Sequence, residues 1–346
     1  MHLLVNTGGG DAPGLNAVLR AVTLSAVRRG FQVTGIRRGY AGLFEPEGVG
    51  LIRMTRDLVR GITDRGGTVL GTVNKGFDEA RCADVVARCK ELRADGLIAI
   101  GGDGSLRIAA KLMDHGLRVI GVPKTIDNDL LCTDETFGFD SAVSFATEAV
   151  SRLTSTAEAH QRVMVVEVMG RYAGWIALYA GIAGAANAIL LPEIEYDIDR
   201  VCAAIRHRYE TERPFAIVVA AEGAREVGGH FTVKAREAGK EITLGGVAEH
   251  VAKAIAERTG YETRSLVLGH LQRGGSPTPA DRILALRYGA AAVRLAVEGR
   301  WGEMVAWHPP RMTSVPIQDA IARCKSVPLD NDAIQTARDL GISLGD

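Results

Sequence analysis

Residues 96–122 read GLIAIGGDGSLRIAAKLMDHGLRVIGV, and this stretch decides the fold. It begins with an apolar run, Gly96–Ile100, and passes through glycines into a helical pattern, Ser105–His115. It then returns to a second run rich in apolar residues, Arg118–Val122. Strands that are apolar along their whole length are typical of a parallel sheet with both faces covered. The stretch therefore predicts a strand–helix–strand unit.

The same alternation extends over most of the chain. Further strands are predicted at residues 3–6, 32–36, 163–168, 188–191, 215–220 and 265–268. Further helices are predicted at residues 13–29, 80–92, 141–157, 198–210, 244–259 and 279–299. We expect an exposed excursion, in the form of a hairpin, at Val227–Thr243, and closing helices from about Met312. Regular alternation of this kind predicts an α/β fold of the doubly wound type, with mostly parallel sheets in a three-layer α/β/α arrangement.

Composition and charge exclude several classes of partner. The 346 residues contain 41 Lys and Arg and 41 Asp and Glu, so the formal net charge is zero, and aromatic residues make up only 5%. We therefore expect no nucleic-acid partner. The longest uncharged stretch, Trp175–Leu191, is shorter than the roughly 20 apolar residues that a membrane span needs. It predicts a buried helix that runs into a strand, and we expect no membrane association.

The five cysteines indicate a reducing compartment. They form no CxxC pair, which argues against a zinc site. An odd number of cysteines in a chain of this length fits reduced thiols in a cytoplasmic protein. Cys82 and Cys89 are seven residues apart, so they share one helical face, and we expect both to point into the core.

Glycine-rich turns follow two of the predicted strands, at the strand ends where open α/β sheets bind ligands. Residues 7–16 read TGGGDAPGLN, and residues 101–105 read GGDGS. Backbone N–H groups in such turns converge on an anion at the positive end of the following helix. Asp103 places a carboxylate inside the second turn, which suits Mg²⁺ beside a phosphate. The alternatives are a tight turn without chemistry at the first site and a helix N-cap role for Ser105 at the second.

A third strand end is rich in charged groups. Residues 121–129 read GVPKTIDND, with one cation, Lys124, one hydroxyl, Thr125, and two carboxylates, Asp127 and Asp129. The two carboxylates alternate, so in an extended chain they point the same way. One could then act on an attacking hydroxyl, while Lys124 neutralises charge on a transferring phosphoryl group. The alternative is a solvated turn, although a turn needs only one Asp or Asn.

Two more strand ends carry arginine. Residues 168–174 read VMGRYAG, and residues 268–277 read LGHLQRGGSP. The planar guanidinium of arginine suits bidentate contact with phosphate, whereas a surface ion pair or a structural histidine is the alternative. Neither glycine turn matches the Walker or the dinucleotide fingerprint, so an NAD-linked dehydrogenase is disfavoured. The residues together predict phosphoryl transfer from a polyphosphate to a hydroxyl of a substrate that itself carries a phosphate.

Six motifs resemble the 6-phosphofructokinase family. In chain order they are GGGDAPGLN, IGGDGS, PKTIDND, HQR, EVMGRYAGW and VLGHLQRGGSP, and the resemblance covers roughly residues 1–310. It implies transfer of a phosphoryl group to the 1-hydroxyl of fructose 6-phosphate by two Rossmann-like domains. The expected donor and Mg²⁺ domain is residues 1–138 with about 272–322. The expected sugar-phosphate domain is residues 139–271 with about 323–346.

The resemblance also implies roles for individual residues. The catalytic group would be Asp127, as general base, with Arg171 and Lys124. The donor phosphates would be held by Gly10, Gly102, Asp103, Gly104 and Ser105, with Mg²⁺ on Asp103. Fructose 6-phosphate would be bound by Thr125, Ile126, Asp127, Met169, Gly170, Arg171, Glu222, His270, Leu271, Gln272 and Arg273. Arg162 and Arg264 would reach the site from a neighbouring subunit, so the resemblance implies a homo-oligomer, a dimer or a tetramer.

The phosphoryl donor depends on two positions at which this sequence is mixed. Gly104 is of the ATP type and Lys124 is of the pyrophosphate type. An Asp at position 104 would place bulk and charge where the nucleoside continues, whereas Lys124 excludes nothing, so we expect ATP. Lys75 stands near the place of a donor-binding arginine in bacterial ATP users and would replace it. The alternatives are a pyrophosphate-dependent phosphotransferase and a non-catalytic regulatory paralogue.

Regulation is expected to depart from that of bacterial relatives. These bind effectors in a basic cleft between subunits, and this sequence retains Arg20 there. Leu24, Thr154 and Asn187 stand where charged ligands are expected. We therefore expect weak or absent control through that cleft.

Overall fold

A computed structural model describes residues 1–46, 48–73, 78–229, 233–235 and 243–346 of the chain. By their internal contacts the residues form two compact units. The first unit is Met1–Ser141 with Arg273–Cys324, and the second unit is Ala142–Gln272 with Lys325–Asp346. Each unit has its own sheet with helices on both faces, and the predicted α/β fold with mostly parallel strands is confirmed. Which unit binds which substrate stays a prediction.

The sheet of the first unit has the strand order β13-β12-β5-β4-β1-β2-β3 among the described residues. Its strands are β1 (His2–Thr7), β2 (Gln32–Ile36), β3 (Leu51–Arg53), β4 (Gly96–Gly101), β5 (Val119–Pro123), β12 (Glu303–His308) and β13 (Arg311–Pro316). The five central strands run parallel, and the edge strands β3 and β13 pair antiparallel with their neighbours. The carboxyl ends of β1, β4 and β5 therefore lie at the same edge, where the glycine turns and the PKTIDND segment begin.

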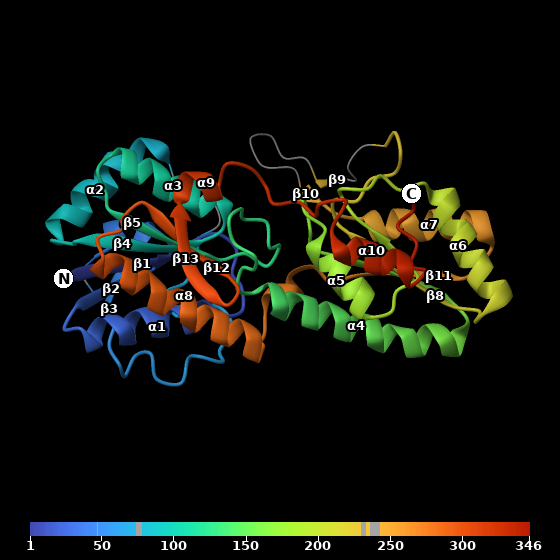
Figure 1. Ribbon diagram of the computed structural model, residues 1–346, viewed down its shortest axis with the longest axis horizontal. Helices are drawn as coiled ribbons and strands as arrows, with labels where there is room; N and C mark the ends of the chain where they lie inside the picture. Colours follow the sequence, from blue (N-terminus) through green and yellow to red (C-terminus); the bar gives the residue numbers. More distant parts are fainter. Residues whose placement is uncertain (47, 74–77, 230–232, 236–242) are drawn as a thin grey trace. The chain divides into compact units, whose positions relative to one another are not determined.

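Helices cover both faces of this sheet (Figure 1). One face carries α1 (Leu15–Arg28) and α8 (Pro279–Val297), and the other carries α2 (Cys82–Glu91), α3 (Asp103–Asp114) and the short α9 (Ile317–Ala320). Short 3₁₀ helices lie at η1 (Ala41–Phe44) and η2 (Glu79–Arg81). Successive residues of β1 point to opposite faces, so Leu3 and Leu4 belong to different cores. Cys82 and Cys89 are both buried in the second of these cores, as predicted.

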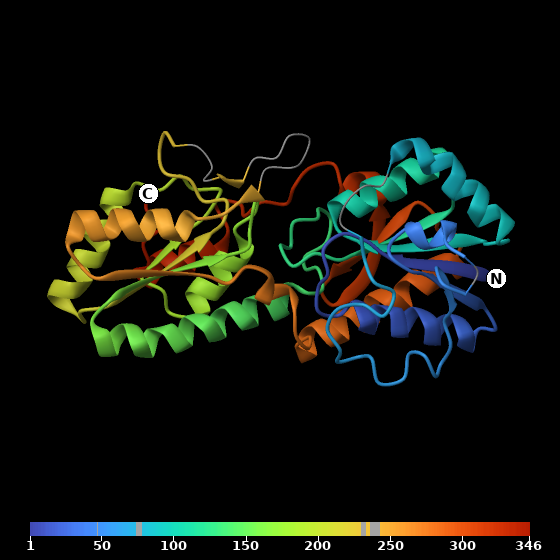
Figure 2. The ribbon, with the colours of Figure 1, turned by 180° about the vertical axis from the view of Figure 1, so that it is seen from behind.

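The second unit contains a parallel sheet of order β11-β6-β8-β7. Its strands are β6 (Val163–Val168), β7 (Ala188–Leu190), β8 (Ala216–Ala221) and β11 (Thr263–Val267). Helices α6 (Ile198–Thr211) and α7 (Val247–Thr259) pack on one face, and α4 (Phe139–His160) and α5 (Trp175–Ala183) lie on the other (Figure 2). The last helix, α10 (Asp332–Asp339), packs against α5, and Ser343 then pairs with Ala188 beside β7.

The predicted strands and helices up to residue 299 agree with the structure, but β3 and β12 have no counterpart among them, and the C-terminal part differs. The prediction of closing helices from about Met312 is wrong at its beginning, because residues 311–316 form the strand β13. The helices α9 and α10 follow this strand. This edge strand is exposed or half-buried at every position, so it carries little apolar signal. The predicted buried helix after Trp175 is confirmed as α5. Within the described part of the chain, no helix is both long enough and apolar enough to cross a membrane.

The predicted hairpin in Val227–Thr243 is described only in part. A short strand β9 (Val233–Ala235) pairs antiparallel with β10 (Thr243–Leu244), as a hairpin requires. The remaining residues of this excursion that lie in 230–232 and 236–242 are outside the described residues.

Candidate active site

The two glycine turns meet at Ser105. Gly8, directly after β1, donates its N–H to the carbonyl of Ile100 near the end of β4, at 2.9 Å. A Cβ atom on Gly8 would lie 2.7 Å from the Ser105 Oγ, and a Cβ atom on Gly101 would also collide with this side chain. Only glycine permits so close an approach of the two backbones. The turn before α1 and the turn before α3 therefore pack together around one hydroxyl group.

Two cations lie against the first of these turns. The Lys124 Nζ donates to the carbonyl of Gly10, and the Arg273 Nη1 donates to the carbonyl of Asp11 at 3.1 Å. Burial lowers the pKa of Lys124 to about 8, and the nearby positive charge of Arg273 acts in the same direction. Two cations beside a glycine turn form a setting for the negative charge of a polyphosphate.

The second turn leads directly into α3, which begins at Asp103. The N-cap is Gly102, which has extended backbone and no side-chain cap, so Ser105 is not the N-cap and that alternative is wrong. The first backbone N–H groups of α3 have no partner within the helix and carry its positive dipole end. A Cβ atom on Gly104 would meet no described atom within 4 Å, so a side chain there would extend into open space.

Asp103 has a partner that the sequence analysis missed. Its Oδ2 accepts a hydrogen bond from the Arg107 Nε at 2.8 Å, and the Arg107 Nη2 donates to the carbonyl of Ile321 at 2.6 Å. The spacing of four residues on one helix is the signal that could have found this pair. Arg107 thus holds one oxygen of the Asp103 carboxylate.

Asp127 and Asp129 form a half-buried pair of carboxylates, in each of which the Oδ1 atom is buried. Burial raises the pKa of both, and the charge of Asp129 raises the pKa of Asp127 further. The charge of Asp103 contributes to the raised pKa of Asp129, whereas Lys124 and Arg273 act in the opposite direction on Asp127. The five groups therefore lie within electrostatic reach of one another in the first unit.

Two carboxylate oxygens in this cluster have no protein donor. Among the residues that the structure describes, none donates a hydrogen bond to the Oδ1 of Asp127 or of Asp129, although both atoms are buried. Such atoms are costly unless a ligand, a cation or water satisfies them. Within the same residues no group of three His, Cys, Asp or Glu side chains forms a metal site of its own. The cluster fits Mg²⁺, which takes few carboxylates and completes its shell with phosphate oxygens and water.

Two further predicted site residues of the first unit, Ile126 and Thr125, already have surroundings within the protein. The Ile126 side chain is fully buried in the core, so only its backbone could contact a substrate. Thr125 accepts a hydrogen bond on its Oγ1 from the backbone N–H of Asp127, at 3.1 Å. Lys75 lies outside the described residues.

In the second unit, the predicted residues gather at the carboxyl ends of β6 and β8. The backbone N–H of Met169 donates to the Gln272 Oε1 at 3.3 Å, and the N–H of Glu222 donates to the carbonyl of Val168 at 2.9 Å. A Cβ atom on Gly223 would collide with the carbonyl oxygen of Arg171, so the two loops cross closely here.

The remaining predicted residues of this group lie on the 3₁₀ helix η3 (Gly269–Arg273). Gln272 is buried and donates from Nε2 to the carbonyl of Gly269 within η3, at 3.1 Å, while its Oε1 accepts the Met169 N–H and so ties η3 to the end of β6. His270 and Leu271 are exposed on the same short helix. Gly170 adopts a φ of +140°, a conformation that few other residues share.

Arg162 and Arg264 do not join this group. Arg162 precedes β6 and Arg264 is the second residue of β11, so both lie at the amino ends of their strands. Their guanidinium groups share one carboxylate, that of Glu262, with N–O distances of 2.9 and 2.7 Å. The length of β6, roughly 16 Å at about 3.3 Å per residue, separates them from Met169 and Gly170.

Comparisons with known proteins place the chain among phosphoryl-transfer enzymes. A family model described as phosphofructokinase matches residues 2–296. The chain belongs to the phosphofructokinase family.

Individual members of the family are closely similar over the whole chain. A relative named ATP-dependent 6-phosphofructokinase, from Chloroflexus aurantiacus, is 48% identical, over 99% of this chain and 97% of its own length. Another named pyrophosphate–fructose 6-phosphate 1-phosphotransferase, from Amycolatopsis methanolica, is 47% identical, over 95% of this chain and 96% of its own length. The solved phosphofructokinase of Saccharomyces cerevisiae superimposes with a TM-score of 0.81 at 28% identity; this chain is covered to 99% and spans 48% of the yeast chain.

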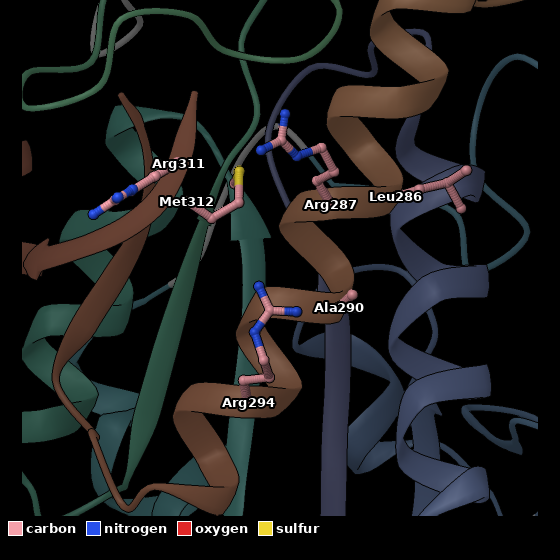
Figure 3. A pocket seen from close by; sticks show the side chains of 6 residues that line it. All are labelled: Leu286, Arg287, Ala290, Arg294, Arg311 and Met312. Atoms are coloured by element: carbon pink, nitrogen blue, oxygen red, sulfur yellow. The ribbon is translucent and has the colours of Figure 1, made fainter. Parts of the chain in front are cut away.

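A separate arginine-lined pocket lies elsewhere on the first unit of this phosphofructokinase. It has a volume of about 490 Å³ between α8 and β13, and it is lined by Leu286, Arg287, Ala290, Arg294, Arg311 and Met312. Figure 3 shows Arg287 and Arg294 extending from α8, with Ala290 on the turn between them. The Arg287 guanidinium lies 3.9 Å from the centre of the Trp307 ring and donates to the carbonyl of Pro310 at 2.9 Å. The lining of this pocket includes none of the predicted site residues.

Arg20, which the resemblance places in an effector cleft, has a partner within the first unit. Its Nη1 donates to the carbonyl of Val59 at 2.7 Å. Weak control through that cleft stays a prediction.

Proposed function

We propose that this phosphofructokinase transfers the γ-phosphoryl group of ATP to the 1-hydroxyl of fructose 6-phosphate, which yields fructose 1,6-bisphosphate and ADP. The observation that carries the proposal is the cluster in the first unit. Two glycine turns, two cations and three carboxylates, Asp103, Asp127 and Asp129, come together at the carboxyl ends of β1, β4 and β5. The family match and the names of the similar relatives support the same reaction.

In this proposal the first unit binds the donor. Gly10, Gly102, Gly104 and Ser105 would contact the phosphates through the glycine turns and the amino end of α3. Mg²⁺ would be held at Asp103, where it would screen the negative charge of the donor phosphates. Residues of the second unit, among them Met169, Gly170, Arg171, Glu222 and His270, would bind the sugar phosphate.

Asp127 would be the general base. Its unpaired Oδ1 would accept the proton of the sugar 1-hydroxyl. At the same time the oxygen of this hydroxyl would bond to the γ-phosphorus, and the bond between the γ-phosphorus and the β–γ bridging oxygen would break. The electron pair of the broken bond stays on ADP. Because the phosphoryl group carries spread negative charge during transfer, the cations Lys124 and Arg171 would stabilise it.

The choice of ATP rests on Gly104. Similar relatives carry both donor names at nearly equal identity, so identity does not separate the two donors. The open space at Gly104 leaves room for the rest of a nucleotide beyond the phosphates. Lys124, buried against the first glycine turn, adds a cation that a pyrophosphate user would also employ, and this keeps pyrophosphate as the second candidate.

One coupled assay tests both candidates. Fructose 6-phosphate is supplied with Mg²⁺ and either ATP or pyrophosphate to the same preparation, and product formation is followed. We expect turnover with ATP and at most a trace with pyrophosphate. Turnover with pyrophosphate alone overturns the donor, and no turnover with either donor leaves the non-catalytic paralogue.

We also propose that the active enzyme is a homo-oligomer in the cytoplasm, in which Arg162 and Arg264 act in a neighbouring subunit. Their position at the amino ends of β6 and β11, away from Met169 and Gly170, supports action outside their own second unit. The edge strand β11 supports a subunit contact, because Leu266 and Val267 are 41% and 44% exposed on it. The five cysteines, an odd number, fit a reducing compartment.

A further inference from the structure

Asn128 stands between Asp127 and Asp129 in the sequence, and its backbone is unusual. It has a φ of +50°, in the left-handed region that most side chains avoid. Asn is among the few residues other than glycine that adopt this conformation readily. The left-handed residue turns the chain between Asp127 and Asp129, so it sets the directions in which both carboxylates leave the backbone.

The side chain of Asn128 ties this turn to the segment that follows it. Its Oδ1 accepts the backbone N–H of Thr136 at 3.1 Å, and its Nδ2 donates to the carbonyl of Asp134 at 3.3 Å. The Thr136 Oγ1 donates in turn to the carbonyl of Thr125, at 2.7 Å. The backbone is therefore fastened to residues 134–136 on both sides of Asp127.

This supporting segment is itself fixed to the sheet and to α8. The backbone N–H of Trp307, in β12, donates to the Thr133 Oγ1 at 2.9 Å, and the N–H of Asp134 donates to the carbonyl of Trp307 at 2.9 Å. The hydroxyl of Tyr288, in α8, donates to the carbonyl of Glu135 at 2.6 Å. Residues 133–136 are thus held from two elements that lie far along the chain.

The support matters because Asp127 lacks a hydrogen bond of its own at the reacting atom. No described residue donates to its Oδ1, so the direction of that oxygen depends on the backbone from which the side chain extends. We propose that Asn128 and Thr136 are positioning residues that aim the Asp127 carboxylate at the substrate hydroxyl. The proposal rests on the role of Asp127 in the proposed function.

A pair of substitutions at Thr136 tests the proposal with little change in shape. Thr136→Val removes the hydroxyl that donates to Thr125 and keeps the side-chain volume, whereas Thr136→Ser keeps the hydroxyl. We expect kcat of the Val variant to fall about 10-fold or more, since small misplacements of a catalytic group have effects of this size. The KM values for both substrates should stay near those of the wild type, because the second-unit residues proposed to bind the sugar phosphate are unaltered and the aim of the base matters most in the transition state. The Ser variant should retain most of the wild-type kcat.

Asn128→Gly provides an independent variant. Glycine accepts the positive φ without strain, so this variant removes the side-chain hydrogen bonds to Thr136 and Asp134 and keeps the backbone conformation. We expect the same loss of kcat at unchanged KM. Arg93→Gly is the matched control, because Arg93 also has a positive φ, of +52°, outside the cluster, and it should behave as the wild type.

The outcomes separate this inference from the proposed function. An inactive wild type overturns the proposed function and the positioning role together. An active wild type with Thr136→Val and Asn128→Gly at wild-type kcat overturns the positioning role alone. A loss of kcat that is equal in the Val and Ser variants, or that is accompanied by a matching rise in KM, also overturns it, because a general packing defect then explains the data.

Discussion

Single residues decide the chemistry of the cluster, and Asp127 carries the largest predicted effect. Asp127→Ser removes the general base and leaves the rest of the turn in place. We expect kcat to fall by roughly 10²–10⁴-fold, the usual contribution of a positioned base. The KM for fructose 6-phosphate should change little, since the second-unit residues proposed to bind the sugar phosphate are unaltered.

The measurement is steady-state kinetics, which gives kcat and the KM for fructose 6-phosphate of Asp127→Ser and of the control variant Asp57→Ser. Asp57 is exposed and forms an ion pair with Arg60 on the surface, so its variant should match the wild type. A kcat of Asp127→Ser close to that of Asp57→Ser would mean that another group takes the proton.

The pH dependence of kcat/KM reports the same residues. The base must be ionised, and burial raises the pKa of Asp127, so activity should fall with acid well above the usual carboxyl range near about 4. Lys124 acts as a cation, and its pKa is lowered to about 8, so activity should fall again as the pH rises through that value. Lys124→Met should lower activity and remove the alkaline fall. If kcat/KM of this variant still falls at high pH, the fall is caused by another group.

Between elements, Asp281 makes a connection that can be tested by stability. This fully buried residue in the first turn of α8 accepts the N–H of Gly138 on Oδ1, at 2.8 Å, and the N–H and Oγ of Ser141 on Oδ2, at 2.8 and 2.6 Å. It thereby holds the beginning of α4 against α8. Asp281→Asn turns an amide N–H toward a backbone N–H, and we expect a loss of about 1–3 kcal/mol in the free energy of unfolding.

The loss at Asp281 should depend on pH. Burial raises the pKa of this carboxyl to about 6, above its unfolded value. The stability that the group contributes is therefore complete below the unfolded pKa and is lost as the pH rises through about 6. The difference between wild type and Asp281→Asn should shrink over this range in urea unfolding, with Asp57→Asn as control. A difference that grows with pH would contradict the raised pKa.

Strands and helices differ in how well the sequence predicts them. The central strands β1, β4 and β6 are apolar because both faces are covered, and this pattern is local. β13 is an exposed edge strand with no comparable pattern, so it was predicted as helix. Edge strands take their place from a partner, here β12, and not from their own composition.

The candidate site divides in the same way. Glycine turns and the carboxylates of the PKTIDND segment are visible in the sequence because short motifs carry them. The support of that segment is not visible, because Thr133 and Trp307 meet across 174 residues of chain. The ion pair between Arg107 and Asp103 could have been predicted from the sequence, because Arg107 follows Asp103 by about one helical turn.

For the whole molecule, the exposed edge strand β11 predicts assembly. Leu266→Glu places a charge among exposed apolar side chains, and a buried charge at a subunit contact is unfavourable. We expect the variant to have a smaller mass by light scattering than the wild type, and lower activity, because Arg162 and Arg264 would no longer reach a neighbour. Ile283→Glu, at an exposed apolar position of α8, is the control. An unchanged mass of Leu266→Glu would place the subunit contact elsewhere.

The order of the chain has a consequence for synthesis. The first unit takes α8, β12 and β13 from Arg273–Cys324, after the chain has built most of the second unit. A nascent chain that has left the ribosome only as far as Ser141 lacks the helix that covers α1 and the strand that covers β5. Fragments that end before Cys324 should therefore engage chaperones or be degraded, and the catalytic cluster can form only near the end of translation.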